Sequence, residues 1–206
     1  MGFFKGKKDA VKQYAESLSK PKKSEVVQIT FGAGYIDTCN QILDAVKQGK
    51  WSGGNQMTIS FDDSLLAEID GAVSGHYATG RVLYSDDMQF LDVVGESFHQ
   101  EELRELYNQV QDGWLSGFLM PEPLNPHDPN AISVMIICDA PEGEEGLRVI
   151  QSGHLKKEQA KKVAKKIINF VEQDAYIPVL LKLSGGSLDK PNLGVIARAK
   201  TDKVKF

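Results

Sequence analysis

The sequence has few of the residues that mark a disulfide-bonded, metal-binding or membrane-spanning protein. Its 206 residues contain two cysteines, Cys39 and Cys138, and no C-x-x-C pair or Cys/His cluster. A structural zinc site is therefore not expected, and a reduced protein is a simpler interpretation than one disulfide, which stays open. No apolar run is long enough for a signal peptide or a transmembrane helix. We therefore expect a soluble, cytoplasmic protein with no membrane partner.

Catalytic motifs are also missing from the sequence. It contains neither G-x-S-x-G nor H-E-x-x-H. A G-x-G pair starts at Gly32, but no Walker lysine follows and the third glycine position holds Asp37, so an ordinary turn is favoured over a nucleotide site. Asp128 with His154 as an acid–base pair, or Ser97 as a nucleophile, would need a geometry that sequence does not supply. We expect no enzymatic activity, no metal and no cofactor.

The charge is weakly acidic overall and basic at the N-terminus. The formal net charge of −4 argues against a general nucleic-acid coat protein but allows a local basic groove. Residues 1–23 form a basic arm with seven lysines and two acidic residues, and its apolar spacing allows a short helix over 9–18 with Val11, Tyr14, Ala15 and Leu18 on one side. The arm is either a phosphate-attracting segment or a solvated, frayed terminus, and we favour the frayed terminus. Residues 24–86 form a small α/β segment of no assigned family, with strands predicted at 24–31 and 57–61 and helices at 36–46 and 64–73.

The central stretch 121–137 combines turn chemistry with a buried strand. Four prolines exclude a helix over 121–130, and the apolar run that follows from residue 131 predicts a strand. The polar residues between the prolines either form a rigid binding loop or satisfy only their own backbone. These residues are Asn125, His127, Asp128 and Asn130.

The remaining C-terminal segments alternate between strand and helix patterns. The helix predicted over 153–171 has one apolar stripe and an opposite face of lysines, which is either a solvated face or a phosphate-contact surface. The other predicted elements are strands at 90–95, 114–120, 131–138, 147–151, 177–183 and 193–200, and a helix at 99–110.

Three sequence blocks occur in a fixed order: VVGESFHQEELRELY at 93–107, PEPLNPHDPNAISVMII at 121–137 and GHLKKEQAKKVAKKI at 153–167. In the order and residue pattern of these blocks, the segment 87–200 resembles the HIRAN domain, a small module found alone or fused to helicases and nucleases. The middle block is the most specific. The resemblance implies an OB-like barrel with flanking helices over 87–200. Together with the arm (1–23), the α/β segment (24–86) and a short tail (201–206), this predicts an α+β fold.

The resemblance also implies a ligand, because characterised family members bind single-stranded DNA, in particular a free 3′ end. When the family pattern is carried over position by position, it implies three roles in this chain. Aromatic rings would stack on bases, one carboxylate would lie beside the terminal hydroxyl, and basic side chains would contact phosphates. The sequence departs from the pattern at two positions: Ser97 stands where members carry arginine, and Leu193 falls near a late aromatic. The implied DNA-binding residues are Phe98, His99, His127, Asp128, His154, Lys156 and Lys157.

Two functions follow from the sequence. The first is non-catalytic recognition of single-stranded DNA or a 3′ DNA end, in DNA repair, replication or a mobile-element context. The second is a protein–protein adaptor that keeps the HIRAN fold without binding DNA, with residues 24–86 as a possible partner-binding segment. The acidic net charge and the changes at Ser97 and Leu193 motivate the second.

Overall fold

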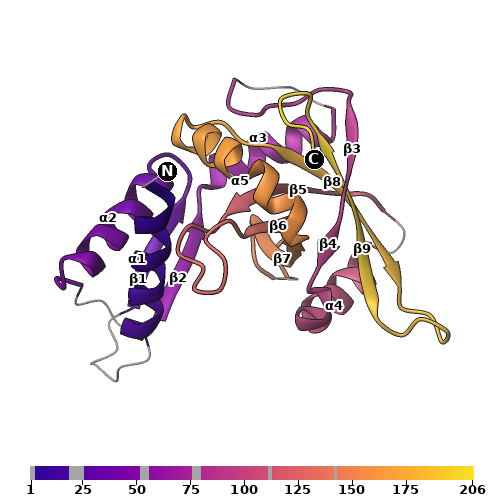
Figure 1. Cartoon of the computed structure of the whole chain (residues 1–206). Helices are drawn as coiled ribbons and strands as arrows, with labels where there is room; N and C mark the ends of the chain where they lie inside the picture. The colour runs from indigo at the N-terminus through magenta and orange to yellow at the C-terminus, as the bar shows by residue number, and fades with distance from the viewer. Residues whose placement is uncertain (1–2, 19–25, 52–55, 76–79, 111–112, 142) are drawn as a thin grey trace.

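The computed structural model describes residues 3–18, 26–51, 56–75, 80–110, 113–141 and 143–206, and shows an α+β protein (Figure 1). Its helices are α1 (Phe3–Leu18), α2 (Tyr35–Lys47), α3 (Asp63–Val73), the 3-10 turn η1 (Glu96–Phe98), α4 (Gln100–Val110) and α5 (Lys157–Glu172). Its strands are β1 (Val26–Phe31), β2 (Gln56–Phe61), β3 (Met88–Leu91), β4 (Val93–Val94), β5 (Leu115–Pro121), β6 (Ile132–Asp139), β7 (Leu147–Leu155), β8 (Pro178–Gly185) and β9 (Leu193–Lys200).

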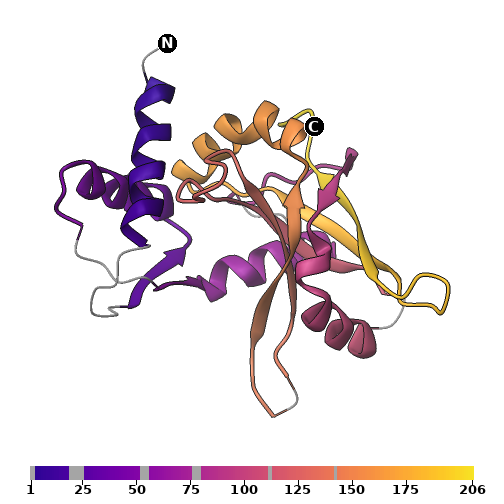
Figure 2. The same ribbon diagram turned by 60° about the horizontal axis from the view of Figure 1, so that its bottom comes forward.

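Seven of these strands form a nearly closed antiparallel barrel. The strand order is β3-β9-β8-β5-β6-β7-β4, so β3 and β4 lie at opposite edges of the sheet. Asp92 alone separates these two strands in the chain, and the sheet therefore curls back on itself. The start of α5 holds this junction, because the Lys156 N–H donates to the Asp92 carbonyl at 2.7 Å and the Asp92 N–H donates to Gln159 Oε1 at 2.9 Å. Figure 2 shows the β6–β7 hairpin projecting from the barrel.

The helix predicted over 153–171 begins later than expected. Residues 153–155 belong to β7, where they pair with β4 and β6, and α5 starts at Lys157. A side chain at Gly153 would place its Cβ 2.6 Å from the Val94 carbonyl oxygen, and glycine therefore allows β4 to approach β7. The apolar stripe of α5 is buried as predicted, by Ala160, Val163, Ala164, Ile167 and Val171.

The described part of the basic arm is a helix that packs on the rest of the chain, so the expectation of a frayed terminus is wrong there. Helix α1 lies against α2 and buries one apolar face, formed by Ala10, Val11 and Tyr14. The Tyr14 ring meets the Trp51 ring edge-on, with centroids 6.2 Å apart. This burial fixes α1 beside the rest of the chain. Residues 19–25, which hold the end of the predicted arm, lie outside the described residues.

The N-terminal segment shares a core with the barrel. Strands β1 and β2 form a parallel pair, and Phe31 at the end of β1 stacks on Phe118 of β5 with ring centroids 5.2 Å apart. The Tyr35 hydroxyl donates to the Pro121 carbonyl at 3.1 Å. The tail is also held, because Gln89 Nε2 donates to two of its carbonyl oxygens at 2.7 Å. The segments predicted from the sequence (1–23, 24–86, 87–200 and 201–206) therefore contribute side chains to one common hydrophobic core.

Candidate functional site

The loop between β5 and β6 is held by its own side chains. Asn125 Oδ1 accepts the backbone N–H groups of His127 at 2.9 Å and Asp128 at 3.1 Å. Asp128 Oδ1 in turn accepts the backbone and side-chain N–H groups of Asn130 at 2.9 and 3.1 Å. The second carboxylate oxygen of Asp128 makes no hydrogen bond within the described parts of the chain. The loop is therefore rigid and keeps one acceptor available for a ligand.

A polar network beneath the loop is centred on Glu122. Its carboxylate accepts hydrogen bonds from Ser133 Oγ, from Asn125 Nδ2 at 2.7 Å and from His154 Nε2 at 3.1 Å. Gln151 Nε2 extends the network by donating to Ser133 Oγ at 2.9 Å. Burial alone would raise the pKa of Glu122, but the hydrogen bonds from His154, Ser133 and Asn125 outweigh burial and lower it. The ionised carboxylate therefore ties the loop to β6 and β7.

His154 has one ring nitrogen committed to this network. Because an ionised carboxylate only accepts, the contact with Glu122 places a hydrogen on His154 Nε2. The amide nitrogen of Gln151, 3.2 Å from the same ring nitrogen, is then a close neighbour and not a donor to it. The side chain of His154 is 33% exposed. A phosphate contact from His154 stays a prediction, and it would have to use Nδ1.

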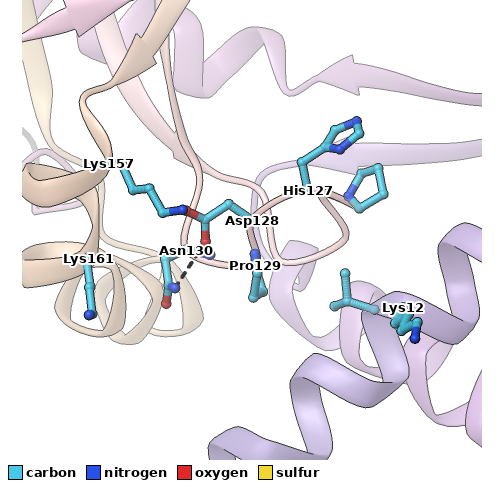
Figure 3. A pocket seen from close by; sticks show the side chains of 9 residues that line it. Lys12, His127, Asp128, Pro129, Asn130, Lys157 and Lys161 are labelled. Atoms are coloured by element: carbon cyan, nitrogen blue, oxygen red, sulfur yellow. Dashed lines mark hydrogen bonds between the residues drawn. The ribbon is translucent and has the colours of Figure 1, made fainter.

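A pocket of about 470 Å³ opens between the loop, α1 and α5 (Figure 3). Lys157 extends toward Asp128, Lys12 lies across the pocket on α1, and the His127 ring points away from Asp128. No ion pair among the described residues involves Lys12, Lys157 or Lys161. Three ammonium groups and one carboxylate therefore line one concavity, an arrangement that attracts phosphate.

Of the seven residues implied by the resemblance, the structure brings three together in this pocket. His127, Asp128 and Lys157 line its wall. Lys156 is the exposed residue that precedes α5, outside the lining of the pocket. His154 lies in the network beneath the loop.

The other two residues, Phe98 and His99, do not line the pocket. Val94 pairs with His154, so η1 begins two residues after the β4–β7 pairing. The Phe98 ring is 86% exposed, whereas His99 is half-buried at the start of α4. The position that falls near the family's late aromatic, Leu193, is buried, so it offers no stacking surface.

Sequence reasoning missed the residues that connect the site. Glu122 stands between two prolines at the end of β5, which was a signal that its position is fixed. Ser133 and Gln151 carried no such signal, because their roles depend on strand register. Lys12 was assigned to the arm alone, and nothing local in the sequence places it opposite α5.

No group of three or more His, Cys, Asp or Glu side chains in the described residues could hold a metal ion. Both cysteines are buried, and neither forms a disulfide. Among the helices that the structure describes, none has the length and apolar character needed to cross a membrane. Comparisons of the chain with protein-family models, curated proteins and solved structures give no match. The family resemblance therefore depends on the three sequence blocks and on a compatible barrel.

Proposed function

We propose that the protein is a HIRAN-like module that binds single-stranded DNA, with an end of the strand in the pocket beside Asp128. The observation that carries this proposal is the meeting of two separated sequence blocks around one pocket. The loop contributes His127 and Asp128, and α5 contributes Lys157 and Lys161. A rigid carboxylate beside ammonium groups offers an acceptor for a terminal hydroxyl and attraction for the neighbouring phosphate.

Base stacking would supply the part of the affinity that does not depend on charge. The exposed ring of Phe98 offers a face to a base, and His127 offers a second, smaller ring above the loop. Stacking on an aromatic side chain contributes about 1–3 kcal/mol per base and tolerates any sequence. The module would therefore select for single strands without reading their bases.

Lys157→Ala is expected to reduce the salt dependence of single-stranded DNA binding. Each phosphate neutralised on a single strand adds about 0.7 to the slope of log K against log salt concentration, so losing one contact should lower the slope by about that amount. Fluorescence anisotropy over a salt series measures this slope. Lys162→Ala is the matched control, because Lys162 is exposed on α5 but does not line the pocket. Equal slopes for wild type and Lys157→Ala would show that Lys157 does not contact a phosphate of the bound strand.

An exposed patch on the barrel favours the adaptor as a second candidate. The side chains of Phe90, Trp114 and Ile196 are 67%, 47% and 41% exposed. The Arg198 guanidinium lies 4.7 Å from the Phe90 ring centroid and 5.5 Å from that of Trp114. Its Nε is buried without a hydrogen-bond partner, and no carboxylate among the described residues pairs with it. This patch fits a protein partner that presents an acidic side chain beside apolar ones.

If the adaptor function is correct, Arg198→Glu should lower recovery of a protein partner about tenfold, because the new carboxylate would repel the partner's acidic group. Capture from a nuclease-treated lysate with purified, immobilised protein measures this recovery. Lys162→Glu, which makes the same charge change on α5, is the control. Recovery of nucleic acid alone from an untreated lysate, with no protein captured after nuclease, would count against the adaptor.

A further inference from the structure

We infer that a second copy of this chain docks on the patch around Arg198, and that it does so with the acidic turn of its β6–β7 hairpin (residues 139–147). Such self-association goes beyond strand binding and does not depend on it. It gives the patch one named occupant. It also gives a role to the acidic turn, which lies outside both the pocket and the Glu122 network.

Arg198 presents a positive charge that the chain itself does not pair with a carboxylate. Its guanidinium contacts the rings of Phe90 and Trp114. In the part of the chain that the structure describes, its one hydrogen bond runs from Nη1 to the weak acceptor Met88 Sδ at 3.9 Å. An arginine held in this way keeps its planar group ready for a carboxylate from outside. The patch therefore suits a partner with an acidic side chain and an apolar contact for the rings.

The acidic turn offers both kinds of contact. Residues 139–147 include four acidic residues and no basic one. Glu144 and Glu145 are exposed, and neither forms an ion pair with another described residue. Ala140 and Pro141 are half-buried in the same turn and supply apolar surface. Figure 2 shows the hairpin projecting from the barrel, where a second molecule can reach it.

The lysine face of α5 is a second positive surface, but it matches the acidic turn less well. None of the large, exposed apolar side chains among the described residues lies on α5. On the patch, Phe90, Trp114 and Ile196 are exposed beside the charge of Arg198. A charge pair that is partly covered by apolar groups loses less to salt screening than a fully exposed pair. The patch is therefore the preferred site for the turn.

The positions of the patch and the turn allow two copies to exchange them. Trp114 directly precedes β5, and Ser116 of β5 pairs with Ile137 of β6, the strand that leads into the turn. The patch therefore lies near the base of the hairpin, and the turn lies at its far end. Two copies related by a two-fold axis would each place a turn on the other's patch, so the same contact forms twice. Two small contacts predict a weak dimer, with a dissociation constant in the micromolar range.

The test is sedimentation velocity of the full, nuclease-treated protein over a concentration series. We expect a reversible monomer–dimer equilibrium for the wild type. Arg198→Glu and the double variant Glu144→Lys/Glu145→Lys should each raise the dissociation constant about tenfold or more, because like charges then meet in both contacts. Lys162→Glu makes the same charge change as Arg198→Glu on α5, and it should leave the equilibrium unchanged.

Mixing the two variants gives the decisive measurement. In a mixed dimer, the unchanged turn of the Arg198→Glu chain meets an unchanged patch. The lysine-bearing turn of the other chain meets the patch that carries the new carboxylate. Both contacts then join opposite charges, so the mixture should dimerise with a dissociation constant within about threefold of wild type.

Three results would overturn the inference. A wild type that stays monomeric throughout the series would leave the patch to a different acidic protein. A mixture that does not dimerise would show that the turn and the patch are not partners. Loss of the dimer in Lys162→Glu would place the contact on α5. The turn variant changes only exposed side chains, so its melting temperature should match that of the wild type and separate lost association from misfolding.

Discussion

Glu122→Ala is expected to lower the free energy of unfolding by about 3–5 kcal/mol, because it removes the acceptor of several partly buried donors at once. Ser133 Oγ, Asn125 Nδ2 and His154 Nε2 all donate to this carboxylate, whose side chain is only 18% exposed. An alanine would also leave a cavity beneath the loop. Urea unfolding followed by circular dichroism gives the change in free energy.

Two variants sharpen this prediction. Glu122→Gln keeps the size of the side chain and one acceptor oxygen, so we expect a smaller loss of about 1–2 kcal/mol. Glu144→Ala removes an exposed glutamate in the β6–β7 turn and should change stability by less than about 0.5 kcal/mol. A loss in Glu122→Ala no greater than that of Glu144→Ala would show that the network does not hold the loop.

The lowered pKa of Glu122 also predicts how the free energy of unfolding changes at low pH. A carboxyl group whose pKa is lower in the folded state stabilises the fold fully above its unfolded pKa, and this stabilisation disappears as pH falls through the folded pKa. The contribution should therefore be complete above the ordinary value of 4.5 and decrease below it. The difference in stability between wild type and Glu122→Gln should shrink as pH falls below that value. A difference that grows in acid would contradict the assigned direction.

Phe98→Ala is expected to weaken single-stranded DNA binding roughly 5- to 150-fold, which corresponds to the loss of one stacked base. The ring is 86% exposed, so its removal should leave the free energy of unfolding within about 0.5 kcal/mol of wild type. Anisotropy titrations with a labelled oligonucleotide and a parallel urea melt separate the two effects.

Phe90→Ala is the matched control for this measurement. Phe90 is also exposed, but it belongs to the patch around Arg198 on β3 and β9 and not to η1. We expect its removal to leave DNA affinity unchanged and to weaken capture of a protein partner. Loss of DNA binding in Phe90→Ala, with normal binding by Phe98→Ala, would show that DNA binds at the patch around Arg198 and not at η1.

Local chemistry predicted most of the secondary structure. The helical spacing of apolar residues in α5 and the turn residues between β5 and β6 both act over a few residues, and both are present in the structure. The start of α5 was placed too early, because residues 153–155 are held in β7 by pairing with distant β4 and β6. A helix was expected over 9–18, but its packing was not, because its apolar face is buried by α2, a segment distant in the sequence.

The candidate site was predictable only in part. The proline and asparagine pattern indicated a rigid loop, and the structure shows how Asn125 and Asp128 fix it. The Glu122 network and the pocket that Lys12 shares with α5 depend on contacts between segments far apart in the chain. Such contacts leave no periodic pattern in the sequence, so only the folded chain shows them.

The most direct test of DNA binding uses fluorescence anisotropy at low and moderate salt with three probes. These are a single strand with a free 3′-hydroxyl, the same strand with a blocked 3′ end, and a duplex. We predict tightest binding to the free 3′ end, weaker binding to the blocked strand because Asp128 loses its hydroxyl partner, and the weakest binding to the duplex. No binding of the single strand at low salt would contradict the account and leave the adaptor as the function to pursue.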